Sequence, residues 1–584
     1  MVDGEKKNSR SFWLYSALRC FQKPISREMK PEEEHGNVMI DSNQTQRAGG
    51  WKAVPYVLGN ETFERLATFG LLANFMVYLL REYHMDLVFA SNVLNIWSGV
   101  TNFAPLVGAF ISDTYTGRFA TIAFGSFASL LGMSIVTLTA WMPQLHPPKC
   151  NLKRCLGPDK AQLGVLLMGL SLLSVGAGGI RPCSIPFGVD QFDSTTEEGI
   201  KGINSFFNWY YTTFTLVLLI TQTVVVYIQD TVSWVIGFGI PTVLMGGSII
   251  LFFIGRRIYV RVKPEGSVFS GIARVFVAVY KKRHLKLPTE GEVDGVFYDP
   301  PLKQTASSKL PLTNQCRFLN KAAFIVDNDL ESDGTPANQW RLCSIQQVEE
   351  IKCLVKICPI WASGIISVTS IAQQGTFIVS QALIMDRHLG PKFQIPAGSI
   401  GVISLITVAI WLPFYDRILV PALQKVTKHE GGITHLQRIG IGIIFSILSM
   451  IVAGLIENKR RGDAILHPHA PPISVMWLAP QLILLGFCDA FNIIGQIEFF
   501  NTQFPDDMRS IANALFSCSF ACASYLSSLL INIVDQVTGG QGHPGWLASD
   551  LNAGRLDYFY FLIAGLGVLN SLYFLYCAHR YHYK

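Results

Sequence analysis

The sequence predicts an all-α membrane protein with twelve transmembrane helices in two six-helix bundles, joined by a long cytosolic linker. Half of its 584 residues are hydrophobic, only 15% are charged, and the mean hydropathy is +0.33. A soluble domain carries about 25% charged residues. The charges gather in 1–57 and 257–345, and the rest of the chain forms long apolar runs. This division is typical of a polytopic membrane protein.

Each predicted span is an apolar run that is long enough for a helix to cross a bilayer, which takes about 20 residues. Lipid cannot satisfy the edge of an open sheet, and the runs far exceed the length of a barrel strand, so we expect helices. The twelve runs lie near 58–80, 91–112, 119–142, 161–181, 205–228, 231–255, 355–384, 394–415, 439–456, 473–500, 510–534 and 558–577.

The spacing of these runs divides the chain into four parts. We expect a cytosolic N-terminal segment (1–57), an N-terminal six-helix bundle (58–256), a cytosolic linker (257–345), and a C-terminal six-helix bundle with a short cytosolic tail (346–584). Transporters built from two such halves hold their substrate near the middle of the bilayer and alternate between two states.

Basic loops orient the chain. Two loops that follow even-numbered spans are rich in Lys and Arg, so the positive-inside rule places both loops and both termini in the cytosol. The segment "ENKRRGD" (457–463) would face outward, as one exception against two agreements. The basic residues of the two loops include Arg256, Arg257, Lys281, Lys282, Arg283, Arg417, Lys425, Lys428 and Arg438.

Composition and motifs point away from an enzyme. No Cys-x-x-Cys or His/Cys spacing suggests a metal site, and no nucleophile–base cluster is evident. The net charge of +6 comes from basic loops and gives no reason to expect nucleic acid as a partner. The first fifty residues lack an apolar stretch, so we expect no cleavable signal peptide. A disulfide between Cys150 and Cys155 stays open, because it depends on an oxidising side.

Three charges stand at the start of the first span, in "GNETFERLATFG" (59–70). Glu61, Glu64 and Arg65 are spaced i, i+3 and i+4, so they share one helix face. Two carboxylates beside one guanidinium form a proton-sensitive cluster, because Arg65 can fully compensate only one of them. The alternative is an ordinary helix start near the headgroups, with Glu favoured by the helix dipole.

Further charges lie inside or at the edge of the membrane. Arg181 ends the fourth span, where it is either functional or a snorkelling boundary residue, and Asp489 lies in the middle of the tenth. A buried charge is costly, so we expect Arg181 or Arg65 to be the partner of Asp489. The orientation of Glu498 stays open.

A turn after the second span, "GAFISDTYTGRF" (108–119), contains Asp113 and Arg118. These two residues can pair across the loop or with a neighbouring helix end, and we interpret them as a gating element. Glycines here permit close helix approach and a tight turn.

At these residues the chain resembles the plant nitrate and peptide transporter family, which comprises proton-coupled oligopeptide transporters of the major facilitator superfamily. The resemblance runs from the first span to the tenth. Its motifs are "ETFER" (61–65), "GAFISDTYTGRF" (108–119), "GAGGIRPC" (176–183), "FGVDQFD" (187–193), "SFFNWYY" (205–211), "RFLNKAA" (317–323), "YDRILVP" (415–421), "LQRIGIG" (436–442) and "GQIEFF" (495–500).

The resemblance implies the major facilitator fold, a cavity between the bundles, and proton symport through Glu61, Glu64 and Arg65. The family's basic residue at the end of span 4 is commonly Lys, and here it is Arg181. Its acidic partner in span 10 is commonly Glu, and here it is Asp489. Arg does not deprotonate in practice, so proton cycling would rest on the carboxylates.

A few positions in the sequence narrow the range of expected substrates. Peptide-carrying relatives usually follow the first-span motif with a tyrosine pair, where this chain has Thr68 and Phe69. Some nitrate-carrying members place a histidine in span 7, where Ile371 stands here. Gln373 and Gln374 are the nearest strong hydrogen-bonding groups, so we include them with Arg181 and Asp489 as substrate-binding candidates.

Two stretches, "GGIRPCSIPFGVDQFD" and "CDAFNIIGQIEFFN", look most like the plant subfamily of low-affinity nitrate carriers and glucosinolate or glycoside carriers. We therefore expect proton-coupled nitrate import, with glucosinolates or other glycosides as the alternative, and peptide transport or nutrient sensing as less favoured readings. The expected partners are a small-molecule substrate, protons and the lipid bilayer, with no cofactor besides the proton gradient. We expect the plasma membrane, with the vacuolar membrane as the alternative; the oligomeric state stays open.

Overall fold

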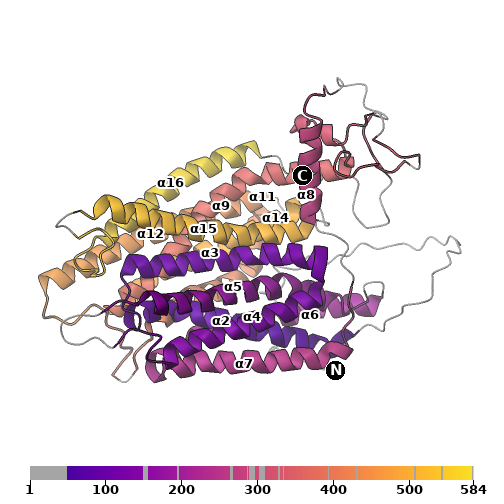
Figure 1. Ribbon diagram of the computed structural model, residues 1–584. Coiled ribbons are helices and arrows are strands. Elements are labelled where there is room, and N and C mark those ends of the chain that lie inside the picture. Colours follow the sequence, from indigo (N-terminus) through magenta and orange to yellow (C-terminus); the bar gives the residue numbers. More distant parts are fainter. Residues whose placement is uncertain are drawn as a thin grey trace, which may run out of the picture.

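In the computed structural model, two bundles of long helices lie side by side, and a smaller linker region packs at one end of them (Figure 1). The predicted N-terminal segment, up to residue 48, and the two cysteines considered for a disulfide lie outside the described residues. The structure describes residues 49–148, 156–193, 196–262, 268–285, 287, 296–300, 310–326, 329–332, 334–391, 393–428, 432–504, 508–540, 544–581 and 583.

The N-terminal bundle contains the first six spans. The fifth span continues from α6 through two π-helical turns to Val232. Asp159 caps α5 in a reciprocal box with Gln162, which satisfies backbone donors that the helix itself leaves free. The helices are α2 (Val54–Arg81), α3 (Leu87–Ile111), α4 (Arg118–Trp141), α5 (Lys160–Val189), α6 (Glu197–Ile220) and α7 (Trp234–Ile254).

The C-terminal bundle contains the other six. Span 8 consists of α10 and α11 joined by a π-helical turn, and span 10 of α13 and α14 joined by the π-helical turn Asp489–Ile493. The helices are α9 (Ile345–Leu383), α10 (Val402–Phe414), α11 (Val420–Thr427), α12 (His435–Leu466), α13 (Ala479–Cys488), α14 (Ile494–Gln503), α15 (Arg509–Thr538) and α16 (Leu556–Arg580).

Twelve helices in the described part of the chain are long and apolar enough to cross a membrane, and the predicted fold class is confirmed. Several helices run past the apolar windows from which they were predicted. The apolar window near 439–456 belongs to α12, which extends to Leu466, because a helix continues in water wherever its caps and side chains permit.

Glycines bring three helices of the N-terminal bundle into backbone contact. A Cβ atom on Gly108 of α3 would lie 1.8 Å from the carbonyl oxygen of Gly178 in α5, and one on Gly125 of α4 would lie 2.9 Å from that of Gly176. Only small residues allow helices in a membrane to approach this closely. Gly117, with φ +76°, makes the turn between α3 and α4. Both glycine roles predicted for "GAFISDTYTGRF" are thus present.

The described contacts between the bundles concentrate in the half of the molecule that the sequence places outside. Helices α3 and α15 lie side by side along this boundary (Figure 1). Asn92 of α3 donates to Asn532 of α15 at 2.7 Å, and Ser524 of α15 donates to Ser98 of α3 at 3.4 Å. One buried apolar cluster, which includes Phe75 of α2 and Phe377 of α9, spans both bundles here. The two halves are thus closed toward the outside.

The linker forms a folded platform on the cytosolic extension of α9. Helix α9 has 39 residues, about 58 Å at 1.5 Å per residue, which exceeds the bilayer core of about 30 Å. Helix α8 (Val268–Lys281) runs across the ends of the spans (Figure 1). Val275 of α8 packs with Leu319 and with Val348 of α9, all fully buried. Lys282 pairs with Asp329 at 2.8 Å.

In the basic segment that broke the positive-inside rule, one of the three cations is neutralised by a carboxylate and the other two contact neutral groups. At the outer end of α12, Arg460 donates to both oxygens of Glu457, at 2.7 Å and 2.8 Å, and both side chains are buried. Lys459 lies 3.8 Å from the ring centroid of Trp477, and Arg461 donates to the carbonyl of Asn552. The pair of Arg460 and Glu457 therefore accounts for part of this exception.

Candidate functional site

The first carboxylate of the predicted cluster, Glu61, is held by a guanidinium and a phenol. Arg65 donates to Glu61 Oε1 from Nη2 at 2.6 Å and from Nε at 2.8 Å. The hydroxyl of Tyr210, on α6, donates to the same oxygen at 2.7 Å and accepts from Arg65 at 2.5 Å. Glu61 is only 2% exposed, so these contacts exclude the reading of an ordinary helix start among headgroups.

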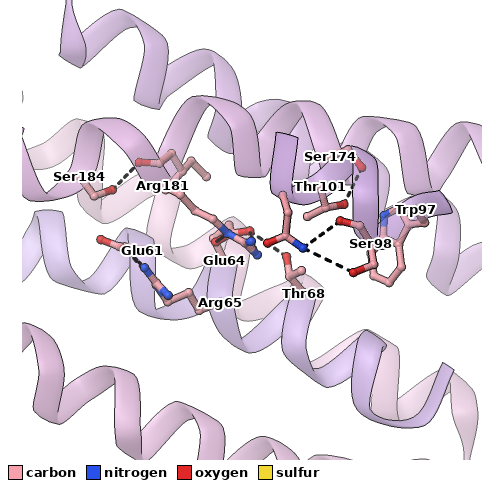
Figure 2. A network of polar contacts seen from close by, with 12 residues as sticks. Glu61, Glu64, Arg65, Thr68, Trp97, Ser98, Thr101, Ser174, Arg181 and Ser184 are labelled. Atoms are coloured by element: carbon pink, nitrogen blue, oxygen red, sulfur yellow. Dashed lines mark hydrogen bonds and ion pairs between the residues drawn. The ribbon is translucent and has the colours of Figure 1, made fainter. Parts of the chain in front are cut away.

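The second carboxylate, Glu64, has partners of its own. Arg181 of α5 donates to Glu64 from Nε and Nη2, both at 3.4 Å, and Thr68 donates to Oε1 at 2.7 Å. Figure 2 shows Glu64 beside Arg181 and Thr68, with the pair of Glu61 and Arg65 next to it along α2.

This arrangement corrects the predicted cluster of two acids and one base. Arg65 does not serve two carboxylates alone, because Arg181 supplies a second positive charge. With both carboxylates ionised, the four side chains carry no net charge. The snorkelling interpretation of Arg181 is wrong, since its side chain is 16% exposed and paired with a fully buried carboxylate.

Aromatic rings and a small pocket border the charged groups. The Arg65 guanidinium lies 4.7 Å from the ring centroid of Phe214, and the Arg181 guanidinium lies 5.7 Å from that of Phe69. Such contacts favour a cation on the face of a ring. The pocket lies between α2 and α6 and is lined by Leu58, Glu61, Thr62, Arg65, Tyr210, Thr213, Phe214 and Val217.

Asp489 does not form the predicted pair with Arg181 or Arg65. Both arginines bind carboxylates of their own bundle, whereas Asp489 belongs to a helix of the other bundle. Its Oδ1 is buried and has no hydrogen-bond partner among the described residues. It begins the π-helical turn of span 10, and such turns often occur at functional sites.

The other acid of span 10, Glu498, is accounted for inside the C-terminal bundle. Arg438 of α12 donates to it at 2.6 Å, and His435 lies 3.6 Å away. Because both partners are on α12, this group joins α12 to α14 and leaves Asp489 as the unpaired acid of the span.

The two glutamines of span 7 connect helices within the C-terminal bundle. The amide of Gln373 donates to the carbonyl of Ser527 in α15 at 3.1 Å, and that of Gln374 donates to Ser449 in α12 at 2.6 Å. Both side chains are fully buried. Their carbonyl oxygens are buried and have no partner among the described residues.

Of the two predicted gating residues, Arg118 forms its ion pair with a third residue. Arg118, the first residue of α4, forms an ion pair with Asp190 just past the end of α5. Of the two pairings that the sequence left open, the structure has the one with a neighbouring helix end. Burial raises the pKa of Asp190, because the ionised carboxylate loses hydration there.

Sequence reasoning missed two partners of the charged residues. Tyr210 and Asp190 were seen only inside the motifs "SFFNWYY" and "FGVDQFD", without a role. The signal was their inclusion in a motif, since helix periodicity does not say which residue of α6 reaches α2. Asp230 was also missed; it binds Arg387 of the other bundle at 3.1 Å.

Comparison with known proteins gives consistent results. The sequence profile of the POT family matches residues 119–547. The chain is 62% identical over 558 residues to Protein NRT1/PTR FAMILY 2.13 of Arabidopsis thaliana, covering 94% of this chain and 90% of that protein. It is 59% identical over 542 residues to NRT1/PTR FAMILY 2.12 of the same organism, covering 92% and 93%.

Solved structures share the fold. The crystal structure of the POT family transporter PepTSo superposes with a TM-score of 0.66 at 18% identity, over 91% of this chain and 98% of that chain. An auto-inhibited POT family peptide transporter gives a TM-score of 0.65 at 20% identity, over 91% and 98%. Identities this low show the likeness of the fold alone.

Proposed function

The chain belongs to the POT family of proton-coupled transporters, and from this premise we propose that it imports nitrate as a proton symporter by alternating access. The family and the fold are those of transporters, and the chain is a multi-pass membrane protein. We propose that the proton gradient alone drives transport, without a bound cofactor, and that the protein works in the plasma membrane.

One observation supports this proposal above all. Each of two buried carboxylates in α2 is neutralised by a guanidinium, Glu61 by Arg65 and Glu64 by Arg181. When a carboxylate takes up a proton, its guanidinium loses its counter-charge. A buried cation without a partner is costly, so the protonated site favours an anion in exchange. Proton binding and anion binding thus support each other.

A guanidinium suits nitrate by shape. Its planar fork of donors matches planar oxyanions, and it stays charged at every physiological pH. The contacts of Arg181 with Glu64 are long, at 3.4 Å, whereas those of Arg65 with Glu61 are 2.6–2.8 Å. Arg181 is therefore the arginine that we expect to exchange its carboxylate for the anion.

Asp489 is the residue through which the C-terminal bundle would contribute to this exchange. We propose that it faces the substrate site from span 10, as an acid that must take a proton or a cation when the bundles close around it. Two protons per nitrate would carry net positive charge inward, and one would be electroneutral. Glucosinolates are anions too and would use the same guanidinium.

The proposal is tested by uptake of labelled nitrate and labelled glucosinolate into oocytes at acidic and at neutral external pH. Proton symport of nitrate predicts accumulation of nitrate at acidic pH, lost in Glu61→Gln and in Asp489→Asn while surface expression is kept. Accumulation of glucosinolate without nitrate would show that the substrate is a glucosinolate. Uptake that ignores both pH and Glu61 would overturn the coupling.

A further inference from the structure

We propose that helix α8 of the linker is a lipid-binding element, whose outer face lies in the surface of the cytosolic leaflet and whose exposed cations bind anionic phospholipid headgroups. The outer face is the stripe formed by Ala273, Phe276 and Tyr280. This inference goes beyond the proposed transport function and does not depend on which substrate is carried.

Helix α8 has two unlike faces. Val275 and Ala278 are fully buried in the apolar core of the linker platform. The outer face contains Ala273, Phe276 and Tyr280, which are exposed and share one stripe by their spacing of i, i+3 and i+7. Phe276 is 46% exposed and Tyr280 is 66% exposed. Neighbouring exposed aromatic side chains mark a surface that contacts a membrane or a partner.

The orientation of α8 favours the membrane. Figure 1 shows α8 lying across the ends of the spans. Ile272 packs against the apolar cluster at these ends of α9, α12 and α14, and Phe276 follows it one turn later on the same side of the helix. On the opposite side, the Arg274 guanidinium lies 5.9 Å from the ring centroid of Trp340, in the linker. The exposed ring of Phe276 therefore lies level with the ends of the spans, where aromatic side chains are enriched.

The basic run at the end of α8, "YKKRHLK" (280–286), has one cation inside and others outside. Lys282 is buried and pairs with Asp329 at 2.8 Å. Lys281 and Arg283 are exposed, and neither forms an ion pair within the part of the chain that the structure describes. The Arg283 guanidinium lies 4.3 Å from the ring centroid of Tyr280. The platform thus neutralises the cation that it buries and presents the others beside an aromatic ring.

The charge of this surface suits an anionic leaflet. Arg256 and Arg257 come directly after the sixth span, are exposed, and also have no ion pair among the described residues. Basic clusters next to a span or on an amphipathic helix bind anionic headgroups, with about a fivefold gain in affinity for each cation. The leaflet is already adjacent, because the spans end beside α8. It can therefore cover the aromatic rings and neutralise the cations at the same time.

Fluorescence quenching by lipid tests where the outer face lies. Ala273→Cys, in an otherwise cysteine-free protein, carries an environment-sensitive fluorophore and keeps Phe276 and Tyr280. The labelled protein is placed in nanodiscs of phosphatidylcholine and phosphatidylserine whose acyl chains are brominated close to the headgroup. We expect strong quenching at this position and none at Gln339→Cys, an exposed linker position next to Trp340. Equal quenching at the two positions, or none at Ala273→Cys, would overturn the immersion of α8.

Headgroup recognition is tested by titrating phosphatidylserine into detergent micelles that contain the Ala273→Cys protein with its fluorophore. We expect a saturable fluorescence change with phosphatidylserine and none with phosphatidylcholine or inorganic phosphate. Lys281→Gln should raise the apparent Kd about fivefold.

Lys201→Gln is the matched control, because it removes an exposed cation that has a carboxylate of its own, Glu197. Its apparent Kd should equal that of the unsubstituted protein. An equal response to phosphatidylcholine, or an equal Kd in Lys281→Gln and Lys201→Gln, would overturn the recognition of anionic lipid. Saturation by inorganic phosphate alone would do the same, since it would indicate a site for free phosphate. Nitrate uptake enters neither experiment, so failure of the transport proposal and failure of this one are distinguishable.

Discussion

Arg387 and Asp230 connect the two bundles across the end of the molecule that the sequence places outside. Arg387 follows α9, and Asp230 lies at the end of the fifth span; their Nη1 and Oδ2 atoms are 3.1 Å apart. Both side chains are about nine-tenths buried, and Arg81 of α2 approaches the same carboxylate at 3.6 Å. Opening toward the outside must break this pair.

Substitution Asp230→Asn should favour the outward-open state. Removing one partner of a mostly buried pair leaves the other charge uncompensated, which costs about 2–5 kcal/mol when the pair is closed. We expect a cysteine at Ser98, in an otherwise cysteine-free protein, to react with an impermeant maleimide at least tenfold faster in this variant. Glu197→Gln, which removes an exposed pair with Lys201, is the control. An equal labelling rate in both variants would show that the pair of Arg387 and Asp230 does not hold the outside closed.

Asp489→Asn should not destabilise the protein, because its carboxylate has no charged partner within the described residues. Glu457→Gln should cost about 3–5 kcal/mol, since it strands the buried guanidinium of Arg460. Thermal unfolding of both variants in detergent gives the comparison. A large loss of stability in Asp489→Asn would reveal a structural partner and would count against a role in transport alone.

Gly108→Ala should disrupt the N-terminal bundle, because its Cβ would lie 1.8 Å from the carbonyl oxygen of Gly178. Neither atom can move without separating α3 from α5, so we expect a loss of more than about 3 kcal/mol. Gly164→Ala, on α5 with no atom within 4 Å of the added carbon, should be neutral. Monodispersity and melting temperature of the two purified proteins measure the difference; equal values would show that the contact can relax.

Cys343 should be a sensor of linker docking. Burial raises the pKa of its thiol from an ordinary value of 9 to about 11. Since the folded value exceeds the unfolded one, this group's contribution to docking is complete below pH 9 and is lost as pH rises through about 11. In a variant that keeps Cys343 as its one cysteine, this thiol should be labelled at neutral pH about a hundredfold more slowly than an ordinary thiol.

The comparison thiol is Cys316, which is half-buried in the same linker. Glu349→Gln removes the carboxylate partner of buried Lys352 and one of the two oxygens that accept from Thr313. It should speed labelling of Cys343 and leave Cys316 unchanged. If Cys343 reacts as fast as Cys316 in the intact protein, the linker is not docked as described.

The fold was predictable because apolar runs of about 20 residues have one stable arrangement in lipid. The members of the charged cluster could also be picked out from the sequence, since Glu61, Glu64, Arg65 and Arg181 stand out in apolar helices. Their pairing was not predictable. Which acid Arg181 meets depends on how α5 is placed against α2 in three dimensions, and residue spacing along one helix does not show that placement.

The positive-inside rule shows the same limit. It counts the residues of "ENKRRGD" as free charges, but Arg460 is neutralised three residues from its partner on the same helix. Tyr210 is a second example. It stands among six aromatic or polar neighbours, and nothing in the sequence shows that it is the one that contacts Glu61.

The backbone contacts of α3, α4 and α5 also bear on how the protein moves. Helices that meet at carbonyl oxygens and glycines leave no side chains that can slide past one another, so the N-terminal bundle should behave as a rigid body. Residues carried on these three helices, such as Arg118 and Arg181, should then keep fixed relative positions at every stage of the cycle. Alternation between states is left to the contacts between the two bundles, such as the pair of Arg387 and Asp230.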